Sequence, residues 1–416
     1  MRFDVLVKGG HVVDPAQGIN GRTDVAIRRD RIAACDRDIP AESAARVIDA
    51  SGQYVTPGLI DLHTHIYRGV GYFGIDAESI ACRTGVTTWV DAGSAGAFTL
   101  PGFREFIVDT TPLHVLAFMN ISYVGLSGLN NEEYCNLEAC DVDLFRRVAE
   151  ANHDIVVGVK TRMGTDAVGY QGLEPLRRAL QAAEACGLPV MCHICMAPPP
   201  IEDVLALLRP GDIVTHSFTG ASEKIVSDDG VLLEAARLAR ERGVIFDIGH
   251  GAGSFSFESA EALVAAGFWP DVISTDLHQI SLPGSNLLEP EGGRDRVDVV
   301  ARVKGDGSPA FTLLTAMSKF LHLGMSFTDV VRATTIRPAE LLGMEDQIGT
   351  LQPGACADVA LCTLEDGEFP LSDVHGNTRV ARQMLRNTRT ILRGNEMALR
   401  PLPALPPWIR LVDRGQ

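Results

Sequence analysis

Eight apolar, β-branched segments separated by helical patterns constrain the fold of this chain more than any other feature. The segments end at Leu62, Ala92, Ser122, Thr161, Ile194, Phe218, Gly249 and Leu277. The stretches between them, such as residues 173–180, have the apolar spacing of helices. Strands that alternate with helices form parallel βαβ units covered on both faces. Because eight such strands close into a barrel, we predict an α/β fold with a (β/α)8 TIM barrel over residues 55–346.

The two ends of the chain carry short alternating strands that are too few at either end to fold alone. The N-terminal strands are expected at residues 4–8, 11–13, 24–28 and 45–49. Near the other end, turn residues at 349–354 precede strands expected at 357–361, 380–385 and 390–393. We therefore predict that residues 1–54 and 347–416 combine into one small β-sandwich domain.

Composition narrows the range of partners. The hydrophobic share of 46% and the charged share of 22% are those of an ordinary folded protein. A net charge of −16, without a cluster of basic and aromatic residues, argues against nucleic acid. No apolar run reaches the roughly 20 residues needed to span a bilayer, so a membrane partner is not expected either. A small-molecule substrate is the expected partner, and self-association into a homo-oligomer is left open.

The N-terminus and the cysteines favour a cytoplasmic protein. Residues 1–8 alternate polar and apolar side chains and lack the apolar core of a signal peptide. The nine cysteines do not have the density of a disulfide scaffold, so reduced thiols are expected. Cys192 and Cys195 form a C-x-x-C pair, but their odd spacing on a strand directs them to opposite faces. We therefore do not interpret them as zinc ligands.

The first barrel strand ends with two histidines, His63 and His65. Because they lie two residues apart, both imidazoles point to the same face, at the end of the strand where barrels place their active sites. A single buried histidine is commonly satisfied by a neighbour, whereas two on one apolar strand are typical of a metal site.

Lys160 ends an otherwise apolar strand at residues 154–160. An unpaired ammonium there would carry a desolvation cost of several kcal/mol, so burial favours the neutral amine. A neutral amine can add carbon dioxide to form a carbamate, which can bridge two cations. The alternatives are a lysine that extends to solvent or one that pairs with an acid.

Three further strands end with residues that can bind a metal, namely His193, His216 and Asp276. Each histidine alone is a weak signal, but with His63 and His65 they bring imidazoles from three separate strands. Asp276 could contact a cation and take a proton from water, which is the task of a general base. Without the histidines, a helix N-cap would be the better interpretation of Asp276.

Together these residues resemble the amidohydrolase superfamily, in particular its binuclear branch of dihydroorotases, hydantoinases and dihydroorotase-like deacetylases. That family has His-x-His on strand one, a carboxylated lysine on strand four, histidines on strands five and six and an aspartate on strand eight. The pattern is matched in order by His63, His65, Lys160, His193, His216 and Asp276. The flanking segments at 55–58, 349–354 and 357–358 also resemble the family, so the likeness covers nearly the whole chain.

The resemblance implies two divalent metal ions, with zinc as the default, and a carbamate formed on Lys160 from carbon dioxide. A hydroxide held between the ions would attack an amide or ester carbonyl. Asp276 would accept the proton of the water and pass it to the leaving group. A mononuclear deaminase of the adenosine type is disfavoured, because no acid closely follows His193.

Three residues are predicted to contact the substrate: Arg162, His250 and His278. Arg162 points to the same side as Lys160 and could hold a carboxylate, or else pair with an acid of a loop. His250 lies in a glycine-rich loop, where it contacts the substrate or caps the loop. His278 has the parity of Asp276, so it faces the pocket or orients that aspartate.

The sequence Gly-His-Gly at 249–251 and the long segment at 279–298 most resemble the dihydroorotase-like deacetylases. The resulting hypothesis is the removal of an acyl group, acetyl in particular, from a small carboxylate-bearing amide or ester. One alternative is a cyclic amidase of the dihydroorotase or hydantoinase type. An alternative of another class is a catalytically silent barrel that serves as a scaffold.

Overall fold

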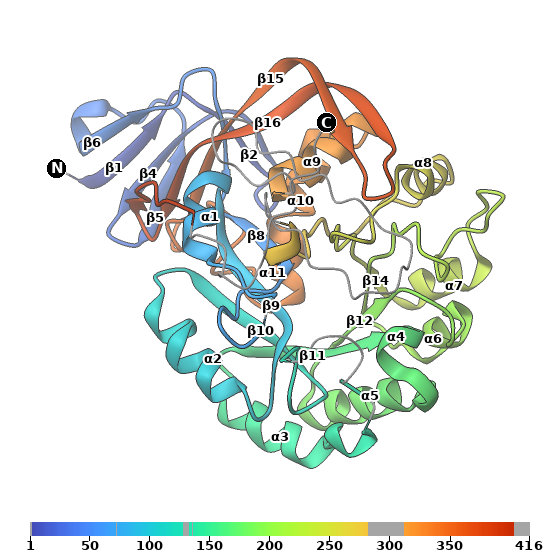
Figure 1. Cartoon of the computed structure of the whole chain (residues 1–416). Helices are drawn as coiled ribbons and strands as arrows, with labels where there is room; N and C mark the ends of the chain where they lie inside the picture. The colour runs from blue at the N-terminus through green and yellow to red at the C-terminus, as the bar shows by residue number, and fades with distance from the viewer. Residues whose placement is uncertain (1, 72, 128–132, 135, 282–311, 403–416) are drawn as a thin grey trace.

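A barrel with helices on its outside lies beside a smaller all-β unit that both chain ends build (Figure 1). The computed structural model describes residues 2–71, 73–127, 133–134, 136–281 and 312–402. Two parts of the sequence predictions lie outside the described residues. These are residues 282–298 of the long segment after strand eight and residues 403–416 of the predicted C-terminal part.

Seven parallel strands of the described chain form one curved sheet in sequence order. They are β8 (Leu59–Thr64), β9 (Val86–Gly96), β10 (His114–Asn120), β11 (Val156–Met163), β12 (Val190–Ile194), β13 (Ile213–Thr215) and β14 (Ile245–Phe246). Residues 272–277 close the sheet through parallel bridges from Asp247 to Val272 and from Thr64 to Leu277. The predicted (β/α)8 barrel is confirmed, with its eighth strand represented by these bridges.

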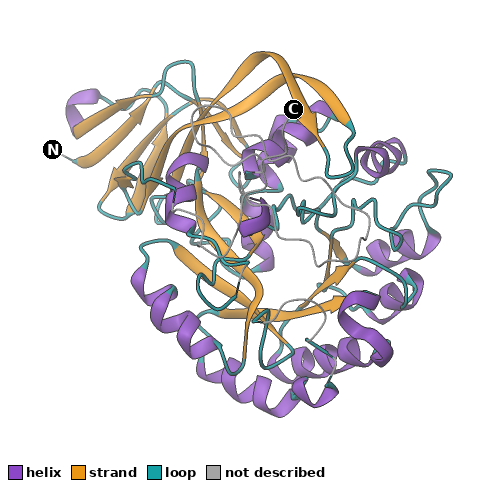
Figure 2. Ribbon diagram, viewed as in Figure 1, coloured by secondary structure: helices purple, strands orange, loops and turns teal. Residues whose placement is uncertain are grey.

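Helices cover the outside of the barrel (Figure 2). Those that lie between barrel strands are α1 (Ala77–Thr84), α2 (Leu100–Phe106), α3 (Val142–Ala151), α4 (Thr165–Val168), α5 (Glu174–Cys186), α6 (Ile201–Leu207), α7 (Glu234–Arg242) and α8 (Phe257–Ala265). Three more helices follow the segment at 272–277 that closes the barrel. They are α9 (Leu313–His322), α10 (Phe327–Arg332) and α11 (Ile336–Leu341). Among the described helices, none combines the length and the apolar character that crossing a bilayer requires.

The sequence of α5 shows why these helices form where they do. Pro175 stands in its first turn, where its missing N–H is not needed, and Gly187 ends it in the left-handed conformation. Leu176, Ala179 and Ala183 recur at helical spacing and are buried against the barrel. The helix is therefore an outer layer whose apolar face supports the strands.

The all-β unit is a sandwich of two sheets with the orders β5-β4-β1-β6 and β17-β16-β15-β7-β2-β3. The first contains β1 (Phe3–Lys8), β4 (Asp24–Arg28), β5 (Arg31–Asp36) and β6 (Ala44–Asp49). The second contains β2 (His11–Asp14), β3 (Ile19–Arg22), β7 (Tyr54–Pro57), β15 (Val359–Ser372), β16 (Thr378–Leu392) and β17 (Asn395–Glu396). Val7 and Ile27 of the first sheet meet Val55 and Leu361 of the second in one core. Leu361 pairs with Val55, so the two chain ends form one unit, as predicted.

Three details of this unit differ from the sequence predictions. β16 is one strand, where two were predicted at 380–385 and 390–393, because the polar residues between them still pair with β15. β3 and β5 were not predicted, since most of their side chains are at least partly exposed. β7 extends to Pro57 and thus crosses the predicted limit at residue 54. The domain limits themselves stay a prediction.

Candidate active site at the mouth of the barrel

β8 brings two histidines to the C-terminal end of the barrel. His63 is buried near the end of this strand, and His65 lies just beyond it. Nδ1 of His65 lies 2.9 Å from Oγ of Ser94, and Nδ1 of His63 lies 2.8 Å from Oγ1 of Thr215. The Thr215 hydroxyl donates to Asp247 over 2.7 Å, so it must accept from His63. Nε2 of His63 therefore carries a lone pair that can bind a ligand.

β12 and the segment that follows β13 supply His193 and His216. The two rings meet edge to face with their centroids 4.1 Å apart. Nδ1 of His216 donates to the carbonyl oxygen of Gly249 over 2.6 Å, so its Nε2 also carries a lone pair. Within the described residues, Nε2 of each histidine is buried without a hydrogen-bond partner. Because proteins rarely leave buried polar atoms unpaired, these two nitrogens indicate a ligand-binding site.

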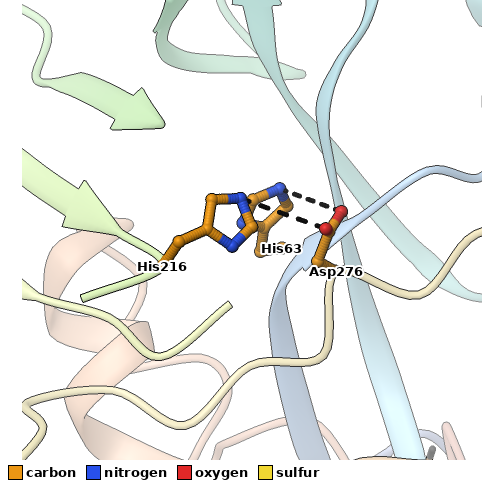
Figure 3. Close-up of side chains that lie close together, drawn as sticks. All are labelled: His63, His216 and Asp276. Atoms are coloured by element: carbon orange, nitrogen blue, oxygen red, sulfur yellow. Dashed lines mark ion pairs between the residues drawn. The ribbon is translucent and has the colours of Figure 1, made fainter. Parts of the chain in front are cut away.

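Asp276 faces the imidazoles of His63 and His216 from the closing segment of the barrel (Figure 3), and that of His65 as well. Its Oδ1 lies 3.0 Å from Nε2 of His65 and 3.3 Å from Nε2 of His63. Its Oδ2 lies 3.9 Å from Nε2 of His216. The backbones of Asp276 (φ 49°) and His216 (φ 67°) are left-handed, which few residues other than glycine adopt. Such strain collects at functional sites, where the surrounding structure holds it in place.

β11 places Lys160 beneath the imidazoles. The lysine is 1% exposed, and its Nζ lies 3.0 Å from Nε2 of His63. Burial lowers the pKa of Lys160 to about 8, although the charge of Asp276 partly opposes this. A Cβ on Gly93 would lie 2.5 Å from Cγ of Lys160, so only a glycine leaves room for the lysine stem there. The amine is thus held in place and is partly neutral near pH 8, in the form that reacts with carbon dioxide.

The structure brings together all six residues predicted as metal ligands, and their chemistry fits divalent cations. Donor atoms of His63, His216 and Asp276 lie within 4.8 Å of one another. Burial lowers the pKa of His63 and His193 well below the ordinary value, and that of His216 to about 4. The imidazoles of these three histidines are therefore neutral at neutral pH, which is the form that binds a metal.

Sequence reasoning missed the polar residues that hold these ligands from behind. Asp247 accepts from Thr215 over 2.7 Å and from Ser274 over 2.8 Å, so it anchors the partner of His63. Asp61 accepts from the backbone N and the hydroxyl of Thr275, next to Asp276. Burial raises the pKa of Asp247 to about 6 and that of Asp61 to about 7. An acid inside an apolar run was the available signal, at Asp61 in the run that precedes His63 and at Asp247 in the run that precedes Gly249.

Arg162 lies on β11 opposite His193 of β12, close to the six residues. Its guanidinium donates to Glu133 over 2.6 Å and to Asp166 over 3.0 Å. Glu133 comes from a loop, which is the alternative considered for this arginine from sequence, and Asp166 lies in the first turn of α4. Contact with a substrate carboxylate would have to compete with these two carboxylates, and it stays a prediction.

His250 and His278 are buried on either side of Asp276 in the chain. Nδ1 of His250 lies 2.9 Å from the oxygen of Gly251, and its Nε2 lies 2.5 Å from Nζ of Lys319. Both ring nitrogens are thus engaged within the protein. The ring of His278 lies 6.1 Å from that of His65, and burial lowers the pKa of His278 to about 4. A role of either residue in binding the substrate stays a prediction.

Comparison with known proteins agrees with this geometry. The model of the Amidohydrolase family matches residues 54–386. A deacetylase of Agrobacterium fabrum is 32% identical over 90% of this chain and 87% of its own length. Two crystal structures, described as an adenine deaminase and a dihydroorotase, are each 30% identical, with TM-scores of 0.82 and 0.81. Each covers 95% of this chain and 99% of its own.

The chain belongs to the amidohydrolase family. It is accordingly a hydrolase that acts on amide bonds, with a TIM barrel that carries its candidate site at the C-terminal ends of the strands.

Proposed function

We propose that this protein is a metal-dependent deacylase that removes an acyl group, acetyl in particular, from a small amide or ester. The observation that carries the proposal is the convergence of four imidazoles, Asp276 and Lys160, with two buried Nε2 atoms unpaired among the described residues. The deacetylase name of the Agrobacterium fabrum relative supports the choice of the acyl group.

Two divalent cations fit this donor set, and zinc is the default because imidazole and carboxylate suit it. His63, His65 and Asp276 would hold one ion, and His193 and His216 would hold the other. Lys160, as a carbamate, would supply oxygen to both. When bound, the ions activate a water molecule and polarise the carbonyl of the substrate.

Asp276 is the proposed general base and acid. Its carboxylate stands among the imidazoles, where it can accept a proton from the attacking water and then deliver it to the leaving nitrogen or oxygen. The Thr215–Asp247 chain holds His63 so that its Nε2 faces this carboxylate. The left-handed backbone at residue 276 fixes the direction of the carboxylate. The residues of this chain therefore orient the reaction and move the proton.

A carboxylate on the substrate is a further part of the proposal, and Arg162 is its proposed contact. Arg162 of β11 is paired with His193 of β12, near the mouth of the barrel. Its guanidinium already forms ion pairs with Glu133 and Asp166. A substrate carboxylate would therefore have to displace or share one of those acids. Comparing each substrate with its uncharged amide tests this part separately.

The runner-up is a cyclic amidase, which the similarity to the dihydroorotase structure favours. The similar structure described as an adenine deaminase adds adenine to the compounds that need testing. A catalytically silent scaffold would need neither Lys160 nor the strained backbone of Asp276. The presence of all six proposed metal ligands therefore argues against it.

The test combines metal analysis, native mass and a turnover panel on protein prepared with bicarbonate and zinc. We expect two metals per chain, a mass increase of one carbon dioxide on Lys160, and turnover of N-acetyl amino acids or acetylated 2-hydroxy acids. Preferred turnover of dihydroorotate, a hydantoin or adenine would replace the deacylase with that activity. Protein that binds no metal would overturn the proposed chemistry altogether.

A further inference from the structure

A buried lysine lies behind the candidate metal centre and has no part in the proposed chemistry. Lys319 comes from α9 and is 1% exposed. Its Nζ lies 2.5 Å from Nε2 of His250 and donates to the carbonyl oxygen of Ser372 over 2.7 Å. Lys319 thus connects helix α9, the end of β15 and the loop that follows β14.

The surroundings of Lys319 disfavour its charged form. Its Nζ lies 4.9 Å and 5.6 Å from the ring centroids of Phe255 and Phe257. Burial lowers the pKa of Lys319 to about 7, and Asp373 is the acid that opposes this shift. Because removing an ammonium from water carries a large desolvation penalty, an apolar side chain would serve packing alone better at this position.

The contacts with Gly251 and Lys319 together fix the tautomer and the position of His250. Nδ1 of His250 faces the carbonyl oxygen of Gly251, which can only accept, so Nδ1 carries the proton. Nε2 therefore accepts from Nζ of Lys319. The imidazole also stacks on Phe255 at an interplanar angle of 16°. The ring is held at both nitrogens and on one face.

The loop that contains His250 in turn touches two of the proposed metal ligands. The carbonyl oxygen of Gly249 accepts from Nδ1 of His216 over 2.6 Å. A Cβ on Gly251 would lie 2.9 Å from Oδ2 of Asp276, so the backbone packs directly against this carboxylate. The N–H of Gly251 donates to Thr275 over 2.9 Å, which ties the loop to the residue before Asp276.

We propose that Lys319 is a positioning residue for the metal centre, acting through His250 on the loop at residues 249–251 and thereby on His216 and Asp276. The proposal goes beyond the acyl group and the substrate, although it rests on the proposed metal centre. It assigns a task to the Gly-His-Gly sequence. The two glycines allow the backbone to approach the ligands, and the histidine between them fastens the loop to α9.

The first test replaces Lys319 with methionine, which keeps the unbranched length of the side chain and removes the amine. Ser318→Ala is the matched control, because Ser318 is buried on the same helix and bonds to Leu314 and Leu385, not to the loop. Zinc dissociation constants are measured for both variants by competition with a chelator. We expect Lys319→Met to weaken zinc binding by roughly 10–100-fold, the usual effect of losing an outer-shell partner. Ser318→Ala should leave zinc binding unchanged.

A second readout needs no metal and no substrate. In metal-free protein, ¹⁵N NMR reports which nitrogen of each histidine carries its proton. The wild type should show the Nδ1–H tautomer for His250 and His216, while Lys319→Met should show mixed tautomers for His250 and a shifted His216. Wild-type signals of His216 in Lys319→Met would overturn the proposal. If the wild type binds no zinc, the proposed function fails, whereas this readout still decides the role of Lys319.

A third variant covers the case in which Lys319→Met does not fold. His250→Phe keeps the ring that stacks on Phe255 and removes both hydrogen-bonding nitrogens. We expect the same 10–100-fold loss of zinc affinity from His250→Phe alone. Where Lys319→Met does fold, the double variant should show no additional loss, because Lys319 acts through His250. Fully additive losses, or wild-type affinity in His250→Phe, would contradict the proposal.

Discussion

In the part of the chain that the structure describes, two groups of metal-binding residue types lie at opposite ends of the barrel, and one of the two has the surroundings of a metal site. The first group, His63, His216 and Asp276, lies at the C-terminal ends of the strands. The second, His114, Cys356 and Asp358, lies at the N-terminal end of β10 and before β15. In both, the donor atoms are within 4.8 Å of one another.

The difference lies in what surrounds the donors. In the first group, Nδ1 of each histidine is held by a protein oxygen, so that each Nε2 is left for a ligand. The positive charge of the nearby Arg162 guanidinium is balanced by ion pairs with the carboxylates of Glu133 and Asp166. Lys160 adds to the first group an amine that is neutral in part.

In the second group the histidine and the acid form an ion pair with each other, although neither Nε2 of His114 nor Oδ2 of Asp358 has a hydrogen-bond partner in the described residues. Nε2 of His114 lies 2.8 Å from Oδ2 of Asp358, and Oδ1 of Asp358 accepts from the backbone of Arg393. The guanidinium of Arg31 contacts the sulfur of Cys356 over 3.5 Å. Burial and then the charge of Asp358 raise the pKa of Cys356, so the thiol stays protonated. A metal there would have to displace a proton and lie close to the guanidinium groups of Arg31 and Arg393, the second of which lies 3.4 Å from Nδ1 of His114. Residue types alone therefore do not define a site.

The largest expected effect comes from removing one histidine of each group. His216→Ala should lose at least one metal per chain and weaken retention of the other, because its Nε2, like that of the neighbouring His193, is buried without a hydrogen-bond partner in the described residues and lies 3.9 Å from Oδ2 of Asp276. Activity should fall to the background of the assay. His114→Ala should keep the full metal content. Metal analysis after gel filtration checks both variants, and loss of metal from His114→Ala alone would reverse the comparison.

Asp276→Asn separates the proton-transfer role of the first group from its metal-binding role. The amide keeps one oxygen near His63 and His65 but cannot accept a proton, so kcat should fall by about 10²–10⁴-fold. Metal content is measured on the same sample. A variant that keeps its metals and stays within threefold of the wild-type kcat would rule out Asp276 as the general base, with this factor set as a rough limit.

The fold and the centre of the site could be predicted because both are encoded in local patterns. Strand ends from Leu62 to Leu277 were visible as apolar runs, and His63, Lys160 and Asp276 each stood at such an end. The outer contacts could not be predicted in this way. Thr215 contacts His63 across 152 positions, and Lys319 contacts His250 across 69 positions. Only the closed barrel brings these residues together, since no local pattern distinguishes them from other core residues.

Formation of the metal centre at the first group should depend on pH, because it requires the carbamate on Lys160. The pKa of Lys160 is lowered from its ordinary value to about 8, so below pH 8 the neutral fraction rises about tenfold for each pH unit. Because only the neutral amine adds carbon dioxide, metal-free protein at fixed dissolved carbon dioxide should be activated by zinc faster at pH 7.5 than at pH 6.5, by roughly the same factor. Activation rates after addition of zinc check this. A rate that does not change with pH or with carbon dioxide would contradict carbamate formation.

The smallest effect expected concerns the glycine that packs against the carboxylate of the first group. Gly251 has a φ of 60°, and a Cβ there would lie 2.9 Å from Oδ2 of Asp276. Gly251→Ala should therefore cost about 1–2 kcal/mol of stability from its left-handed backbone. It should also move the carboxylate by a few tenths of an ångström, which lowers kcat by about tenfold, since a 1 Å displacement can cost roughly 100-fold.

Gly253→Ala in the same loop is the matched control, because Gly253 is exposed and a Cβ there has nothing within 4 Å. Unfolding curves and kcat are measured for both variants. Equal kcat in the two variants would show that the approach of the backbone to Asp276 is not needed, whereas a loss confined to Gly251→Ala would show that the loop sets the position of the carboxylate.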